Sequence, residues 1–126
     1  MNKRILLVEH HEYLRKLLGG FFAPHFEVIG AKDALEALAW LNTGWQPDVI
    51  VVGAQLPKIS TVQFLSTIKH SGLHAGIPVA VLGEKPEDEH PFLAMGAQVY
   101  LSKPFDPLVL NEQINRMIQP VFSPET

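Results

Sequence analysis

Short apolar runs alternate along the chain with segments of helical periodicity, and this alternation constrains the fold more than any other feature. Runs without polar residues, such as Val-Ile-Val-Val at 49–52, are typical of strands buried on both faces of a parallel sheet. We expect strands at residues 5–8, 26–30, 49–52, 77–82 and 99–101. Parallel strands need right-handed crossovers, which helices supply. The predicted fold class is therefore α/β: a doubly wound five-stranded parallel sheet flanked by five helices.

Five segments between and after these strands are predicted to be helices, at residues 11–22, 33–42, 61–70, 86–95 and 106–118. Apolar residues recur along one side of most of them, at helical spacing. The expected inward positions are Leu14, Leu17, Leu18, Phe21, Leu35, Leu38, Leu41, Val62, Leu65, Ile68, Leu110, Ile114 and Met117. Gly19-Gly20 and Pro24 are expected to end the first helix. Asp106 and Pro107 are expected to begin the last one, as N-cap and first helical residue.

The fourth helical segment is anomalous because Pro91 falls inside it. An interior proline removes one helical hydrogen bond and clashes with the preceding turn, at a cost of about 3 kcal/mol. We therefore expect a short, late-starting or irregular helix between the fourth and fifth strands.

Length and composition indicate one soluble domain. The 126 residues suit a single core, and we expect a domain at 1–119 followed by a flexible tail at 120–126. No apolar run approaches the roughly 20 residues of a membrane span. The ten Lys and Arg residues are scattered and the net charge is −3, which argues against nucleic-acid binding. The sequence contains no cysteine, which agrees with the cytoplasmic location that we expect.

Ligands of doubly wound folds bind at the carboxyl ends of the strands. The residues to consider are therefore those that follow each predicted strand. They are Glu9-His10, Gly53, Gly83 and Ser102-Lys103.

Around these positions the sequence resembles the receiver domain of bacterial two-component response regulators. The resemblance covers about residues 3–118. It is clearest at 5–15 (Ile-Leu-Leu-Val-Glu-His-His-Glu-Tyr-Leu-Arg), at 47–57 (Pro-Asp-Val-Ile-Val-Val-Gly-Ala-Gln-Leu-Pro) and at 96–106 (Gly-Ala-Gln-Val-Tyr-Leu-Ser-Lys-Pro-Phe-Asp). The last two motifs, at this separation, are specific to the family.

The resemblance implies a phosphorylation pocket, whose parts fall on five positions of this sequence. The acidic pair that helps to hold Mg²⁺ falls on Glu9 and His10. The phosphoacceptor aspartate falls on Gly53, and the hydroxyl residue that ends the fourth strand falls on Gly83. The lysine that contacts the phosphate is kept as Lys103, and the resemblance implies a cis peptide bond after it.

Three of these five parts have lost their chemistry. Glycine at position 53 has no side chain to phosphorylate, and glycine at position 83 has no hydroxyl. Mg²⁺ prefers oxygen ligands, and Glu9 is the one acidic ligand left. We therefore predict a degenerate receiver that is not a phosphorylation switch, is not an enzyme, and holds no metal or cofactor.

The remaining polar residues of this pocket admit more than one interpretation. The favoured one pairs Lys103 with Glu9, because an unpaired ammonium in a low-dielectric pocket is costly. Alternatively, the space left at Gly53 and Gly83, lined by Lys103 and His10, takes an anion or a small polar ligand. Ordered water filling the space is favoured over that ligand.

Several aromatic and histidine side chains also have two interpretations. His10 and His11 suggest a metal site, but solvated loop residues are favoured because no third ligand follows from the spacing. Trp40 and Trp45 mark a partner surface or, as we favour, pack locally. Tyr100 matches the aromatic residue that rotates in active receivers, and beside Gly83 its rotamer should be fixed by packing.

The function that we favour is a phosphorylation-independent protein-interaction module in or beside a two-component phosphorelay. Its partners would be other signalling proteins or a second copy, and its candidate contact surface comprises Gln98, Tyr100, Pro104 and Phe105. One alternative is a regulatory N-terminal domain joined to an output domain. A flavodoxin-like cofactor protein is disfavoured because no Ser/Thr/Gly-rich loop follows the first strand.

Overall fold

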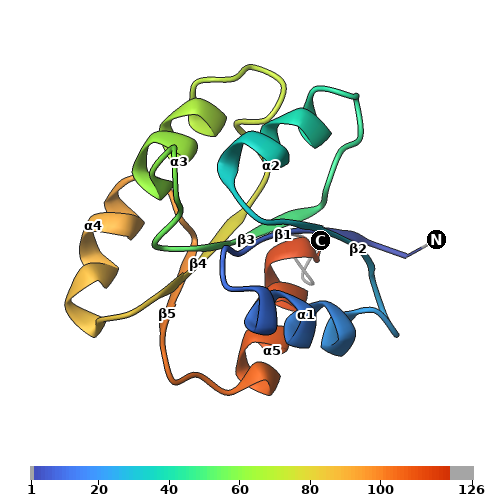
Figure 1. Cartoon of the computed structure of the whole chain (residues 1–126), viewed down its shortest axis with the longest axis vertical. Coiled ribbons are helices and arrows are strands. Elements are labelled where there is room, and N and C mark those ends of the chain that lie inside the picture. The colour runs from blue at the N-terminus through green and yellow to red at the C-terminus, as the bar shows by residue number, and fades with distance from the viewer. Residues whose placement is uncertain (1, 120–126) are drawn as a thin grey trace, which may run out of the picture.

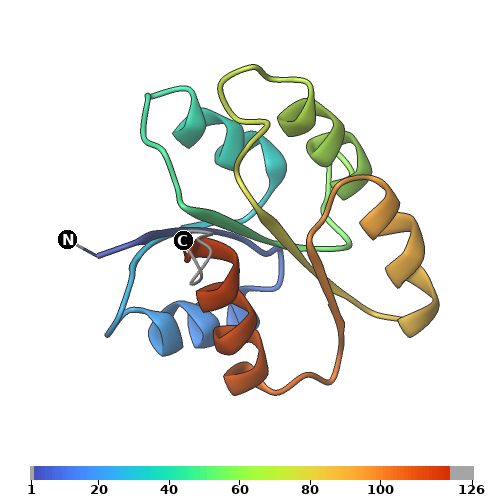
Figure 2. The same cartoon turned by 180° about the vertical axis from the view of Figure 1, so that it is seen from behind.

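Five parallel strands form one sheet with helices on both sides, in the computed structural model of the chain (Figure 1, Figure 2). The structure describes residues 2–119, so the predicted tail at 120–126 lies outside the described residues. The elements are β1 (Arg4–Val8), α1 (Glu12–Phe22), β2 (Glu27–Ala31), α2 (Ala34–Leu41), β3 (Val49–Gly53), α3 (Thr61–Lys69), β4 (Val79–Gly83), a 3₁₀ turn (Pro86–Asp88), α4 (Glu89–Ala94), β5 (Val99–Ser102) and α5 (Pro107–Ile118). The strand order β2-β1-β3-β4-β5 confirms the predicted fold class.

The sheet separates two apolar cores. Alternate strand residues point to opposite faces, so Ile5 and Leu7 pack with α1 and α5, whereas Leu6 and Val8 pack with α2, α3 and α4. Figure 1 shows the same division, with α1 and α5 together below the sheet. Because both faces are covered, β1, β3 and β4 are almost wholly apolar and buried, as the sequence predicts.

Strand register brings the candidate site residues to one edge of the sheet. Val8 pairs with Val52 in β3, Gly53 pairs with Leu82 in β4, and Gly83 pairs with Ser102 in β5. The carboxyl ends of β1, β3, β4 and β5 therefore meet, and the residues that follow them are neighbours in space.

Side-chain caps begin the helices near this edge. Asp33 accepts a hydrogen bond from the Glu36 N–H at 2.9 Å and forms an ion pair with Lys58 at 3.3 Å. The Glu36 N–H is the main cause of a pKa of Asp33 below its usual range. Asp106 accepts from the Leu108 N–H at 2.9 Å, which confirms it as the predicted N-cap of α5.

Several details of the helices differ from the sequence prediction. Gly19 and Gly20 lie inside α1 instead of ending it, because the packing of Leu18 and Phe22 against the sheet stabilises the helix through them. Leu17 of α1, also predicted to face inward, is 50% exposed, because its neighbour Leu18 faces the sheet. The predicted inward residue Leu35 of α2 is 49% exposed. The small Ala34 and Ala37 face the sheet instead, and they let α2 approach it closely.

The predicted inward face of α3 is also partly wrong. Val62 is 46% exposed, whereas Phe64, Leu65 and Ile68 are fully buried. The larger aromatic side chain of Phe64 fills the space between α3 and the sheet, and it sets the rotation of the helix.

The segment between β4 and β5 is short and late-starting, as predicted. A 3₁₀ turn precedes α4, which has only six residues. Pro91 is the third residue of α4, where a backbone N–H would have no acceptor within the helix. The proline is therefore accommodated by shortening the helix.

Candidate functional site

A cavity of about 150 Å³ opens at the carboxyl edge of the sheet. It is lined by Glu9, His10, His11, Gly53, Ala54, Gln55, Glu84 and Lys103. Four of the five predicted pocket residues therefore line one space. The fifth, Gly83, does not line this space and lies against the side chain of Tyr100.

Glu9 is the most buried charged residue of the cavity, with 4% of its surface exposed. It directly follows β1, and its backbone N–H donates to the Ala31 carbonyl at 2.9 Å. One carboxylate oxygen, Oε2, accepts a hydrogen bond from the His11 N–H at 2.9 Å. The other, Oε1, is buried and has no hydrogen-bond partner among residues 2–119. Such an oxygen is costly to leave unpaired.

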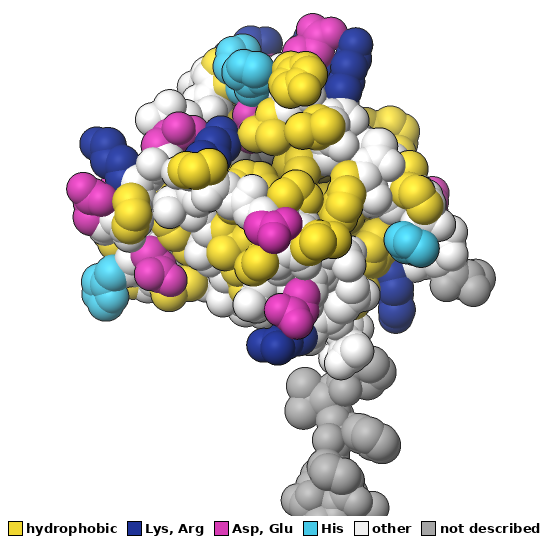
Figure 3. All heavy atoms as spheres, turned by 90° about the horizontal axis from the view of Figure 1, so that it is seen from below, with side chains coloured by type: hydrophobic (Ala, Val, Ile, Leu, Met, Phe, Trp, Pro, Cys, Tyr) yellow, Lys and Arg dark blue, Asp and Glu magenta, His cyan; other side chains and the backbone are white. Residues whose placement is uncertain are grey.

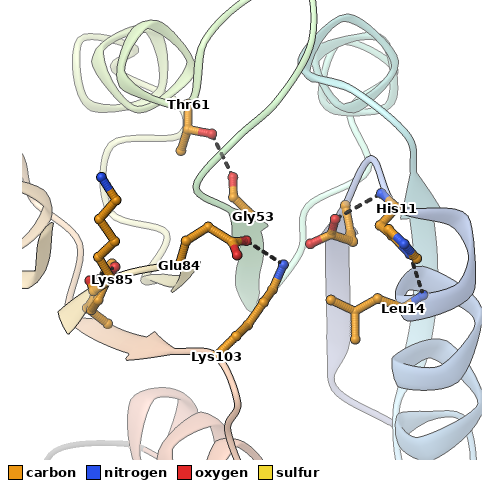
Figure 4. Close-up of polar contacts among 9 residues, drawn as sticks. His11, Leu14, Gly53, Thr61, Glu84, Lys85 and Lys103 are labelled. Atoms are coloured by element: carbon orange, nitrogen blue, oxygen red, sulfur yellow. Dashed lines mark hydrogen bonds and ion pairs between the residues drawn. The ribbon is translucent and has the colours of Figure 1, made fainter.

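Glu9 occupies the space that a side chain at position 53 would need. A Cβ atom built on Gly53 would lie 2.6 Å from Glu9 Oε1, closer than real Cβ contacts. The Gly53 carbonyl accepts a hydrogen bond from Thr61 Oγ1 at 2.6 Å, which fixes the end of β3 (Figure 4). The glycine therefore lets the carboxylate fold over the end of β3.

Lys103 pairs with Glu84, and the predicted pairing with Glu9 is wrong. Lys103 Nζ lies 2.9 Å from Glu84 Oε2, and the two side chains point toward each other in Figure 4. Strand register explains the choice, because Gly83 pairs with Ser102 and the next residues of the two strands are neighbours. Sequence reasoning missed Glu84, although an acid directly after the fourth strand was a usable signal. The Lys103-Pro104 peptide bond is cis, as the family resemblance implies.

Tyr100 occupies the space beside Gly83. A Cβ atom on Gly83 would overlap the hydroxyl and ring carbons of Tyr100. The hydroxyl donates to the Lys85 carbonyl, and the ring stacks on Phe92 with centroids 5.8 Å apart. Burial raises the pKa of Tyr100 above its usual value. Packing thus holds the side chain inward, as predicted.

The four residues of the predicted contact surface do not lie on one face. Tyr100 belongs to the core under α2, α3 and α4, and Gln98 accepts a hydrogen bond from the Val79 N–H at 2.9 Å. Pro104 and Phe105 lie on the other side of the sheet, where they line a groove of about 200 Å³ beside Leu17. The groove is lined by Leu14, Leu17, Leu18, Lys103, Pro104, Phe105 and Pro107. Figure 3, which views the side of α1 and α5, shows apolar side chains gathered there.

The two tryptophans lie away from the cavity and contact each other. Their rings meet edge to face with centroids 6.3 Å apart, and Trp45 packs partly against the core. The Arg4 guanidinium lies 5.8 Å from the centre of the Trp45 ring. Local packing, the interpretation that we favoured, accounts for both residues.

The donor set of the cavity does not fit Mg²⁺. Residues 2–119 contain no cluster of three or more His, Asp or Glu residues placed to hold a metal ion. His11 Nδ1 accepts from the Leu14 N–H at 3.4 Å as the N-cap of α1. Glu84 is engaged by Lys103, so Glu9 Oε1 is the single carboxylate oxygen free of partners in the buried floor. Mg²⁺ is usually held by one or two carboxylates with water completing its octahedral shell, and here His10 and Gly53 supply no carboxylate beside Glu9.

Comparison with known proteins places these features in a family context. A family model described as "Response regulator receiver domain" matches residues 5–115. The chain is 32% identical over 122 residues to the phosphate regulon transcriptional regulatory protein PhoB of Escherichia coli, covering 94% of this chain and 53% of that protein. It is also 32% identical to the alkaline phosphatase synthesis transcriptional regulatory protein PhoP of Bacillus subtilis, covering 94% and 50%. The chain thus spans about half the length of these relatives.

Solved structures show the same architecture. The chemotaxis response regulator CheY4 of Vibrio cholerae superimposes with a TM-score of 0.84 at 25% identity, covering 93% of this chain and 99% of that one. A putative response regulator from Chloroflexus aurantiacus superimposes with a TM-score of 0.87 at 21% identity, covering 94% and 98%. Within the described part of the chain, no helix has the length and hydropathy that a membrane crossing requires.

Proposed function

Because this chain belongs to the response regulator receiver domain family, we propose that it is a receiver module of two-component signalling that works without phosphorylation. The proposal assigns its activity to contacts with other signalling proteins or with a second copy of itself. The observation that carries it is the glycine at the end of β3, over which the Glu9 carboxylate is folded.

An acyl phosphate needs a carboxylate that projects into the pocket from the end of β3. Gly53 has none, and Glu9 is a poor substitute. Its Oε2 is held by the His11 N–H, and its Oε1 is buried against Gly53. Glu9 also projects from the end of β1, not from the end of β3 where the family places its phosphoacceptor. We therefore infer that neither residue accepts a phosphoryl group.

The residues that would link the pocket to the outer surface also differ from what the family resemblance implies. In the family, a hydroxyl residue at the position of Gly83 and an aromatic residue at the position of Tyr100 move together. Here Gly83 offers no hydroxyl, and Tyr100 already fills the space beside it. We propose that this inward Tyr100 gives the molecule one constant surface for its partners. The exposed groove at Pro104 and Phe105 supports a contact role for those two residues.

The anion-gated alternative has less support than the interaction role. Lys103 is the cation that would attract an anion, and Glu84 neutralises it at 2.9 Å. The buried carboxylate of Glu9 would repel an anion as well.

The matched relatives PhoB and PhoP are about twice as long as this chain. PhoB and PhoP are described as transcriptional regulatory proteins. We propose that, where this domain is joined to an output domain, it supplies a constant contact surface to that domain.

The proposal is tested by amide NMR spectra with Mg²⁺ and beryllofluoride, which mimics the phosphoryl group on a receiver aspartate. We expect the spectrum with both to equal that with Mg²⁺ alone, and intact mass spectrometry after acetyl phosphate treatment to show no phosphorylated species. The receiver half of Escherichia coli PhoB, treated in parallel, is the control for the reagents. Saturable shifts at Gly53 and Lys103 that require beryllofluoride would refute phosphorylation independence.

A further inference from the structure

We propose that the cavity at the carboxyl edge of the sheet binds a small organic cation with N–H donors, such as a guanidinium or primary ammonium group. The inference rests on the proposed function in one respect, that no phosphoryl chemistry occupies this cavity. It assigns a ligand class opposite in charge to the anion considered from the sequence.

The charge of the lining favours a cation. Glu9 and Glu84 carry two negative charges and Lys103 one positive charge, so with neutral histidines these side chains sum to −1. The Lys103–Glu84 pair is already formed, and the Glu9 carboxylate has no ion pair among the described residues. The nearby Arg15 guanidinium donates to the backbone carbonyls of Glu9 and His10, not to this carboxylate. In a partly enclosed cavity this charge is weakly screened.

The unpaired oxygen favours a hydrogen-bond donor. Only 4% of the surface of Glu9 is exposed, and its Oε1 has no hydrogen-bond partner among the described residues. This oxygen lies against Gly53, and both residues line the cavity. A charge-assisted N–H bond to a carboxylate is among the strongest hydrogen bonds in proteins. A donor that reaches it removes the cost of the unpaired oxygen.

A guanidinium or ammonium group suits this donor set better than a metal ion. One buried carboxylate oxygen leaves most positions of a Mg²⁺ shell to water. A guanidinium ion needs only one or two acceptors in a plane, and Glu84, whose Oε2 binds Lys103, lines the same cavity and has its Oε1 as a further acceptor. The volume of about 150 Å³ holds a group of this size, because Gly53 and Ala54 contribute little side chain.

The probe is methylguanidinium chloride, titrated into the intact chain and followed by amide NMR. We expect saturable shifts centred on Glu9, Gly53 and Lys103. Tetramethylammonium chloride at equal concentration is the matched control, because it has the charge but no N–H donor. Equal shifts with both salts, or no shifts with methylguanidinium, would overturn the proposal.

Two variants locate the site. Glu9→Gln removes the charge of the buried carboxylate and should weaken methylguanidinium binding about tenfold. Glu84→Gln lies on the exposed wall, where folding is not at risk, and should weaken binding severalfold. Glu112→Gln, in the middle of α5 and outside the lining of the cavity, is the control and should bind as wild type does. Unchanged affinity in both pocket variants would refute the assignment.

A free metabolite and an arginine side chain of a partner protein share this chemistry. A short peptide with a central arginine, compared with the same peptide carrying citrulline, separates the two sources. Tighter binding of the arginine peptide than of methylguanidinium identifies a protein source, and equal binding identifies a free ligand. Failure of all these probes while beryllofluoride is also silent would refute this inference alone and leave the proposed function intact.

Discussion

A methyl group added at Gly83 should force Tyr100 out of its inward position. The Cβ of a Gly83→Ala variant would overlap the hydroxyl and ring carbons of Tyr100, and the ring has Phe92 on its other side. The backbone of β4 is held on both edges by β3 and β5, so the tyrosine must move.

The cost follows from what the displaced ring loses. A buried aromatic side chain removes about 150–250 Å² from water, worth up to about 4–6 kcal/mol at 25 cal/mol per Å². The hydrogen bond from Tyr100 to Lys85 adds about 1 kcal/mol. Part of the ring stays covered after it moves, and replacing glycine by alanine returns about 0.4–1 kcal/mol through the unfolded chain. We expect Gly83→Ala to lower the free energy of unfolding by about 2–4 kcal/mol.

Urea unfolding measures this change, and Gly20→Ala is the matched control. The same atom is added in α1, where nothing lies within 4 Å of the new Cβ. Gly20→Ala should raise the free energy of unfolding by up to about 1 kcal/mol. Absorbance titration of tyrosinate gives a second signal, because the raised pKa of Tyr100 should fall once its ring is exposed.

A double-mutant cycle isolates the proposed clash. In a Tyr100→Ala background the penalty of Gly83→Ala should vanish, since the space is empty. The reasoning is refuted if Gly83→Ala matches Gly20→Ala in stability and leaves the tyrosine titration unchanged.

Three further substitutions test other contacts. Asp33→Ala should cost about 1 kcal/mol at neutral pH through loss of the α2 cap. The pKa of Asp33 is lowered in the folded state, so the stabilisation that it gives is present at neutral pH and disappears as the pH falls through that lowered pKa. Urea unfolding at neutral and at acidic pH measures this loss. Gly53→Asp should displace the Glu9 carboxylate and lower the free energy of unfolding by about 1–3 kcal/mol. The loss should be larger at neutral than at acidic pH, because two ionised carboxylates repel each other. Gly53→Asn, with equal size and no charge, should lack this pH dependence. Lys103→Met should change stability by less than about 1 kcal/mol, since its ion pair is half-exposed. A double-mutant cycle should find the coupling of Lys103 with Glu84 and none with Glu9.

The features that follow from local pattern were predictable from the sequence. β1, β3 and β4 are buried on both faces and give continuous apolar runs, and the shorter apolar runs of the edge strands β2 and β5 lie between turn signals. All five strands were located to within about two residues. The short α4 follows from Pro91, and the start of α5 follows from Asp106-Pro107. Each of these signals is local and chemically specific.

The features that depend on packing between elements were not predictable. The alanines of α2 face the sheet in place of Leu35, because the distance between helix and sheet selects the face. The pairing of Lys103 with Glu84 depends on strand register, whereas the family resemblance assigns a role to Gly83 and none to the residue that follows it. The folding of Glu9 over Gly53 is a three-dimensional contact between β1 and β3 that no spacing rule reports.

Gly53 and Gly83, at the carboxyl edge of the sheet, each lie against a larger side chain that fills the space beside them. Glu9 occupies the space of position 53, and Tyr100 that of position 83. A larger side chain introduced at either position therefore meets an occupied space, and the neighbouring side chain must rearrange to admit it. Positions 9 and 53, and positions 83 and 100, are thus coupled in pairs, so a redesign of this edge that adds an aspartate at 53 or a hydroxyl residue at 83 needs a compensating change at Glu9 or Tyr100.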